Sequence, residues 1–91
     1  MKIYSRNGIT LEAQYLYRQG LEMMSRKMDE KALNYFRQAV FLSPRFSRAC
    51  REIGECLTRL GRHEEAREYF IKTIRIDPAV TGIVVEKILS D

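Results

Sequence analysis

The sequence repeats itself at a fixed interval. The segment NYFRQAVFLSP at residues 34–44 recurs in altered form as EYFIKTIRIDP at residues 68–78, an offset of 34 residues. The same offset relates Gly20 to Gly54 and Glu30 to Glu64. A constant period of this length is the signature of stacked units that each consist of a few secondary-structure elements. The chain is therefore expected to fold as a short array of two similar units.

Within each unit, small and apolar residues recur every three or four positions, which is the spacing of one face of an α-helix. The residues that define the two copies are Leu16, Gly20, Met23, Ala32, Phe36, Ala39 and Pro44 in the first, and Cys50, Gly54, Leu57, Ala66, Phe70 and Pro78 in the second. The pattern predicts helices over residues 10–26, 29–42, 45–60 and 62–76. Gly61 and the two prolines supply the signals that end helices. Because the connections are short, each copy is expected to be an antiparallel α-hairpin.

The two mid-helix glycines need a structural reason, since glycine costs about 1 kcal/mol relative to alanine in a helix. We expect a close approach of the facing helix, which presents the small residue Ala66 opposite Gly54. Phe70 would then fill the space one turn further along. The first copy has the same arrangement of residue types.

The period, together with glycine, Ala-x-x-x-Phe and proline in this order, resembles the tetratricopeptide repeat. The matching segments are LYRQG, ALNYF and SP in the first copy and CREIG, AREYF and DP in the second. Leu16 and Cys50 stand where the family has a bulky aromatic residue, and Met23 and Leu57 where it has tyrosine. Lys27 replaces the turn glycine of the first copy, which is therefore expected to turn less tightly.

The resemblance implies an all-α fold, a right-handed superhelical α-solenoid of two α-hairpins and a capping helix in one domain of residues 1–91. The expected divisions are an N-terminal segment with the start of the first helix (1–12), two repeats (13–46 and 47–80) and a C-terminal capping helix (81–91). Apolar residues of the capping segment spread over about 240° of the helix circumference at 100° per residue. Part of that surface is expected to remain exposed.

The resemblance also implies a function, because repeats of this family bind peptides or helices of partner proteins in a concave groove lined by the first helix of each copy. Helical geometry assigns one set of residues to that face: Gln14, Tyr17, Leu21, Met24, Arg48, Arg51, Glu55, Thr58, Val85 and Leu89. The expected partner is a protein or peptide with an acidic or carboxylate group, flanked by apolar residues, that contacts Arg48 and Arg51.

Simpler interpretations of the same residues remain open. Tyr17, Leu21 and Met24 could pack against residues 1–5 or fill space between helices, and the two arginines could form weak pairs with Glu52 and Glu55 on a solvated face. A family branch that captures chaperone C-termini uses a clamp of Lys, Asn and Arg. The clamp positions hold other residues here, so this specificity is not expected; they are Tyr17, Leu21, Glu52, Gly82 and Glu86.

Two other kinds of binding are alternatives. Fewer than about three repeats seldom suffice for independent stability, so the capping helix could form a homodimer through Ile83, Val84 and Ile88. A less favoured alternative is an RNA-binding helical repeat. Its surface would combine five arginines with three aromatic rings, namely Arg45, Arg48, Arg51, Arg59, Arg62, Tyr15, Tyr17 and Phe46.

Catalysis is not expected, because no nucleophile arrangement or phosphate-binding loop is present and His63 is the only histidine. No cofactor or metal is expected either. Cys50 and Cys56 point about 240° apart on one helix, which predicts two reduced thiols. Charges of both signs are mixed along the chain and sum to +4, and no apolar run is long enough to span a bilayer. These features predict a cytoplasmic protein with no membrane partner.

Overall fold

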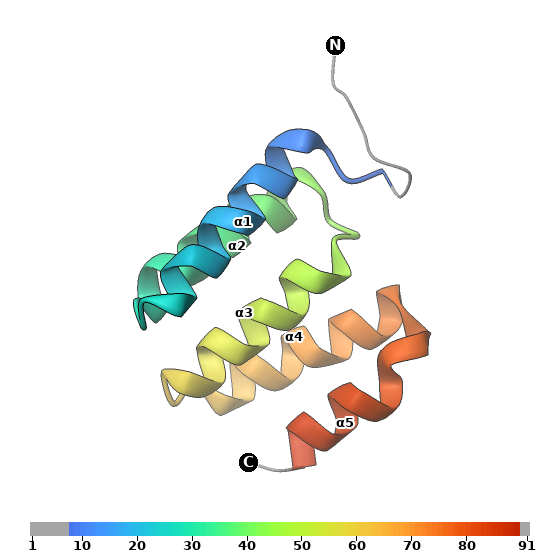
Figure 1. Ribbon diagram of the computed structural model, residues 1–91. Helices are drawn as coiled ribbons and strands as arrows, with labels where there is room; N and C mark the ends of the chain where they lie inside the picture. Colours follow the sequence, from blue (N-terminus) through green and yellow to red (C-terminus); the bar gives the residue numbers. More distant parts are fainter. Residues whose placement is uncertain (1–7, 90–91) are drawn as a thin grey trace.

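The computed structural model describes residues 8–89 of the chain (Figure 1). The elements in order are α1 (Leu11–Ser25), α2 (Asp29–Leu42), α3 (Ser47–Arg59), α4 (His63–Ile76), the short 3-10 helix η1 (Pro78–Val80) and α5 (Thr81–Leu89). The described part of the chain contains no strand, which confirms the all-α prediction. Each of the first four helices begins and ends within two residues of its predicted bounds. The η1 turn was not predicted.

The helices form two consecutive hairpins and a cap (Figure 1). Helix α1 packs along α2 and α3 along α4, while α2 also contacts α3 and thereby joins the hairpins. Helix α5 packs on α4. One core cluster is shared by both hairpins, with Leu33 and Phe36 of α2 beside Ile53 and Leu57 of α3. The result is the helical-repeat solenoid that the sequence period predicts.

The two hairpin turns have the same geometry. Lys27 and Gly61 both adopt the left-handed conformation, with φ of 63° and 79°. In the first turn the Met28 N–H donates to the Met23 carbonyl at 2.9 Å, and the equivalent bond of the second turn is 2.8 Å. This pattern is a Schellman motif in both copies. The expectation that the first copy turns less tightly was therefore wrong, because Lys27 accepts a conformation that normally favours glycine.

The mid-helix glycines lie against phenylalanine rings. A Cβ atom placed on Gly20 would lie 2.5 Å from Cε1 of Phe36, and one placed on Gly54 would lie 2.6 Å from Cε1 of Phe70. Both rings are fully buried. Close approach was the right expectation, but it is the aromatic ring itself that lies over the glycine, instead of one turn further along.

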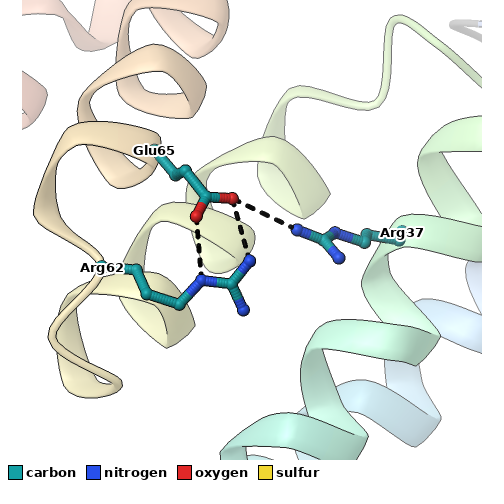
Figure 2. Close-up of polar contacts among 3 residues, drawn as sticks. All are labelled: Arg37, Arg62 and Glu65. Carbon is teal, nitrogen blue, oxygen red and sulfur yellow. Dashed lines mark hydrogen bonds and ion pairs between the residues drawn. The ribbon is translucent and has the colours of Figure 1, made fainter.

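Ion pairs link the hairpins at their edge. Figure 2 shows Arg37 of α2 reaching Glu65 of α4 at 3.7 Å, while Glu65 also accepts two hydrogen bonds of 2.9 Å from Arg62. The hydrogen bonds from Arg62 are the main reason that the pKa of the Glu65 carboxyl is lowered. A second link joins Arg59 of α3 to Asp29 of α2 at 3.4 Å. Such exposed pairs add little stability but favour one relative placement of the hairpins.

Helix α5 caps the second hairpin through one face. Val84 is fully buried, and Ile88 packs against the shared core cluster. Lys87 forms an ion pair with Glu55 of α3. The Val84 side chain belongs to the core of this chain, so it is not available to a partner chain that packs side by side on α5. Ile83 and Leu89 are 56% and 78% exposed, as expected for part of the cap surface.

The 34-residue offset relates α5 to α1 and α3, because Ile88 falls on the position of Gly20 and Gly54. None of the helices between residues 8 and 89 is long and apolar enough to cross a membrane.

Candidate partner-binding cleft

A cleft of about 690 Å³ opens between the N-terminal halves of α1 and α3 and the end of α4. Its walls come from three parts of the chain that are far apart in sequence. The lining residues are Ile9, Gln14, Tyr17 and Arg18 from the first part, Arg45, Phe46, Ser47, Arg48 and Arg51 from the second, and Thr73, Asp77 and Val80 from the third.

Local hydrogen bonds hold the N-terminal end of α1 beside the loop that precedes α3. The Thr10 N–H donates to Oγ of Ser43 at 3.1 Å, and Oγ1 of Thr10 accepts from the Ala13 N–H at 3.0 Å as the N-cap of α1. Ile9 is buried with Ala13, Ala39, Phe46 and Ala49 in a second core cluster. These contacts anchor the N-terminal wall of the cleft to the first hairpin and to α3 at once.

Two aromatic rings, Tyr17 and Phe46, line the cleft, and the buried Phe36 packs against Tyr17. The Tyr17 ring lies 5.0 Å from the Phe46 ring and 5.7 Å from the Phe36 ring, measured between centroids. Phe46 is only 7% exposed. Burial, and next the negative charge of Glu52, raises the pKa of the Tyr17 phenol, so the hydroxyl stays protonated and neutral.

Four arginines give the cleft its charge. Arg18 lies on α1, Arg45 lies in the loop before α3, and Arg48 and Arg51 lie on the first two turns of α3. None of the four forms an ion pair with a carboxylate among the described residues. Asp77 is the only acidic residue among the described residues of the lining. Four positive side chains therefore face one negative side chain.

The two carboxylates that were the alternative partners of these arginines form no ion pair with them among the described residues. Glu55 pairs with Lys87 of the cap instead of with Arg51. Glu52 is partly buried, and burial is the main cause that raises the pKa of its carboxyl, although Arg51 opposes that shift. Arg48 and Arg51 therefore form no ion pair within 4 Å in the described part of the chain, although the charge of Arg51 still attracts the Glu52 carboxylate.

Four of the ten predicted groove residues line the cleft, namely Gln14, Tyr17, Arg48 and Arg51. The other six do not. Leu21 and Met24 pack against the core cluster, the Thr58 hydroxyl donates to the Gly54 carbonyl at 2.9 Å, and Glu55 pairs with the cap. Val85 and Leu89 lie on α5, outside the lining. The packing of residues 1–5 against this face lies outside the described residues.

Three charged residues of the cleft lining were not predicted for the groove, namely Arg18, Arg45 and Asp77. Arg45, Arg48 and Arg51 recur every three positions, a signal that could have identified Arg45 as a neighbour of the other two. From the sequence, Arg45 was assigned only to the alternative RNA-binding surface. Arg18 and Asp77 come from other segments, and no spacing in the sequence connects them with the arginines of α3.

Comparisons with known proteins agree with this architecture. A family model described as tetratricopeptide repeat matches residues 47–80, which comprise α3, α4 and η1. The uncharacterized protein MJ0572 of Methanocaldococcus jannaschii is 37% identical over 70 residues, a stretch that covers 77% of this chain and 81% of the relative. With its two hairpins, their glycine and phenylalanine contacts and these similarities, the chain belongs to the tetratricopeptide repeat family.

Proposed function

We propose that this chain is a non-catalytic interaction module that binds a segment of a partner protein in the cleft between α1, α3 and η1. Repeats of this family generally act as scaffolds for protein interactions, which gives the class of function. The observation that supports this particular site is the group of four arginines without carboxylate partners among the described residues. Unpaired guanidinium groups around a concave surface favour an anionic ligand.

The chemistry of recognition is a set of charge-assisted hydrogen bonds. Arg48 and Arg51 are neighbours on one face of α3, and each planar guanidinium can donate two parallel bonds to a carboxylate. Tyr17 and Val80 offer apolar surface beside them. We propose that the partner places an acidic side chain or a terminal carboxylate at these two arginines.

A pull-down with matched variants tests the proposed function. The cleft variant is Arg48→Glu with Arg51→Glu, and the control is Arg67→Glu with Arg75→Glu, which makes the same change of net charge on exposed positions of α4. We expect a protein from the source cell to be retained by the wild type and the control and lost from the cleft variant. If every retained protein is retained equally by all three forms, the cleft is not the binding site.

Self-association through α5 is a second candidate, favoured by the exposure of Ile83 and Leu89. Light scattering over a wide concentration range tests it. A dimer that becomes a monomer on Ile83→Glu with Leu89→Glu would support this candidate, and a monomeric wild type at every concentration would reject it. For either function we propose the cytoplasm as the compartment, because two unpaired thiols suit a reducing environment.

A further inference from the structure

We infer that the cleft recognises a run of acidic residues, with about three negative charges close together, and that apolar flanks contribute little to the binding. This inference rests on the proposed function and specifies the partner more narrowly. It also departs from the sequence-based expectation of a single carboxylate between apolar residues. Three properties of the cleft support it: its charge balance, the directions from which the charges come, and its small apolar surface.

The first argument is charge balance. Four arginines and one aspartate leave three positive charges in the described lining. A ligand with one carboxylate would leave two of these charges uncompensated and would force them closer to a low-dielectric surface as water leaves the cleft. A ligand with about three negative charges neutralises the site. Acidic residues next to one another in a sequence supply that charge within the length of the cleft.

The second argument is the placement of the charges. Arg45, Arg48 and Arg51 form one wall beside α3, and Arg18 approaches from α1. A single carboxylate can satisfy one or two guanidinium groups, whereas a chain with several carboxylates can satisfy both walls. Asp77 lies at the η1 end, where its carboxylate accepts a hydrogen bond of 3.2 Å from the Ala79 N–H and is held in place. We therefore expect the residue of the bound peptide that lies beside Asp77 to be neutral or basic.

The third argument is that the free apolar and aromatic surface of the described lining is small, because it comes mainly from the half-buried Tyr17 and Val80. Ile9 and Phe46, the largest aliphatic and aromatic residues of the lining besides Tyr17, are only 8% and 7% exposed. Leu21 and Met24, the expected apolar end of the groove, pack against the core cluster. Little apolar area is left for a flanking leucine or phenylalanine to bury, so the binding energy must come mainly from the charges.

The same surface disfavours RNA, the other polyanion that arginines attract. Single-stranded RNA binding depends on aromatic faces on which bases stack. Phe46 is buried, and the half-buried Tyr17 packs against both Phe46 and Phe36, so the described lining offers one partly covered ring to a base.

The test is a selection from a random dodecapeptide library displayed on phage, with the full chain as bait. Baits are the wild type, a cleft variant with Arg18→Gln and Arg45→Gln, and a control with Arg67→Gln and Arg75→Gln. We expect peptides with three or more Asp or Glu residues within five positions to be enriched on the wild type and on the control. Binding of a synthetic enriched peptide, followed by fluorescence anisotropy, should weaken about tenfold or more in the cleft variant and fall steeply with salt.

The outcomes separate this inference from the proposed function. The wild type could instead enrich apolar peptides with one or no acidic residue, which Arg48→Glu with Arg51→Glu no longer binds. That result would overturn the inference of an acidic run and leave the proposed function intact. Absence of any cleft-dependent peptide would overturn the inference, and the pull-down would then decide the proposed function by itself. A labelled ten-nucleotide uridine RNA that binds more tightly than the best peptide would overturn the inference in favour of nucleic acid.

Discussion

The contact between Gly54 and Phe70 predicts that a better helix former destabilises this protein. Gly54→Ala adds a Cβ atom 2.6 Å from Cε1 of Phe70 and 2.8 Å from both Cδ1 and Cζ. Favourable carbon contacts lie at about 3.5–4.0 Å, so the ring must move by about 1 Å. Phe70 is fully buried, so any movement of its ring displaces other atoms of the closely packed core. The substitution therefore forces the hairpin apart or strains the ring.

The magnitude follows from two opposed effects. Alanine instead of glycine in a helix interior gains about 1 kcal/mol, while overpacking a well-filled core costs about 1–3 kcal/mol. The contacts at 2.6–2.8 Å involve three ring atoms, so we expect the cost to fall at the upper end. Gly54→Ala should lower the free energy of unfolding by about 1–2 kcal/mol. In a domain of this size that loss lowers the midpoint of thermal unfolding by about 4–16 °C.

Urea unfolding followed by circular dichroism at 222 nm measures this change. The matched control is Gly82→Ala, also in a helix, where an added Cβ atom meets nothing within 4 Å; it should leave stability unchanged or raise it by up to about 1 kcal/mol. In addition, Phe70→Leu should cost less in the Gly54→Ala background than in the wild type, since the smaller side chain makes room. An unfolding free energy for Gly54→Ala equal to or above the wild type would refute the reasoning.

Three further predictions concern the turn, the carboxylates and the thiols. Lys27→Gly should stabilise the chain by about 1 kcal/mol in thermal or urea unfolding, because Lys27 holds a left-handed conformation that costs non-glycine residues about that much; a loss of stability would contradict the turn geometry. Glu52→Gln should stabilise the chain at neutral pH, and the gain should shrink as the pH falls through the raised pKa of Glu52, because protonation of the wild type relieves the same burial cost. Glu65→Gln should instead destabilise the chain at neutral pH, because the lowered pKa of Glu65 means that its charged carboxylate stabilises the folded state. This stabilisation is present above the unfolded-state pKa and is lost as the pH falls through the folded-state pKa. Urea titrations from neutral to acidic pH that show the same sign for both variants would contradict these assignments. Burial raises the pKa of Cys56 to about 12 and also raises that of Cys50, so iodoacetamide at neutral pH should label neither thiol in the native protein and both in urea; rapid native labelling, detected by mass spectrometry, would show that these thiols are accessible.

The fold could be predicted almost completely from the sequence because the same physical pattern is present twice. The periodic apolar residues and the terminators after each helix predicted the first four helices to within two residues. The η1 turn was missed because it depends on the Asp77 carboxylate, which accepts from the Ala79 N–H just after a predicted helix end. The left-handed conformation of Lys27 was missed because glycine is the residue that normally adopts it. Here the hydrogen bonds of the turn impose it on a lysine.

The cleft could be predicted only in part. A helical projection fixes the direction of a side chain around the helix axis, and this was enough to place Tyr17 and Arg51 on the same surface. It does not describe how far a neighbouring hairpin covers that surface along the axis, which is why Leu21 turned out to pack against the core cluster. Asp77 joins the cleft through tertiary structure alone, because the end of α4 returns to the first turns of α1 and α3.

The isoleucine at the glycine position of α5 sets a limit on the modular extension of this scaffold. In the two hairpins, a phenylalanine ring occupies the space left by Gly20 or Gly54. Ile88 stands at the corresponding position of α5, and its side chain packs against the core cluster. A phenylalanine facing α5 in the same way would meet the Ile88 side chain in place of a glycine. An engineer who wishes to lengthen the array must first exchange Ile88 for glycine, and must then supply the incoming phenylalanine as the replacement for the lost core contact.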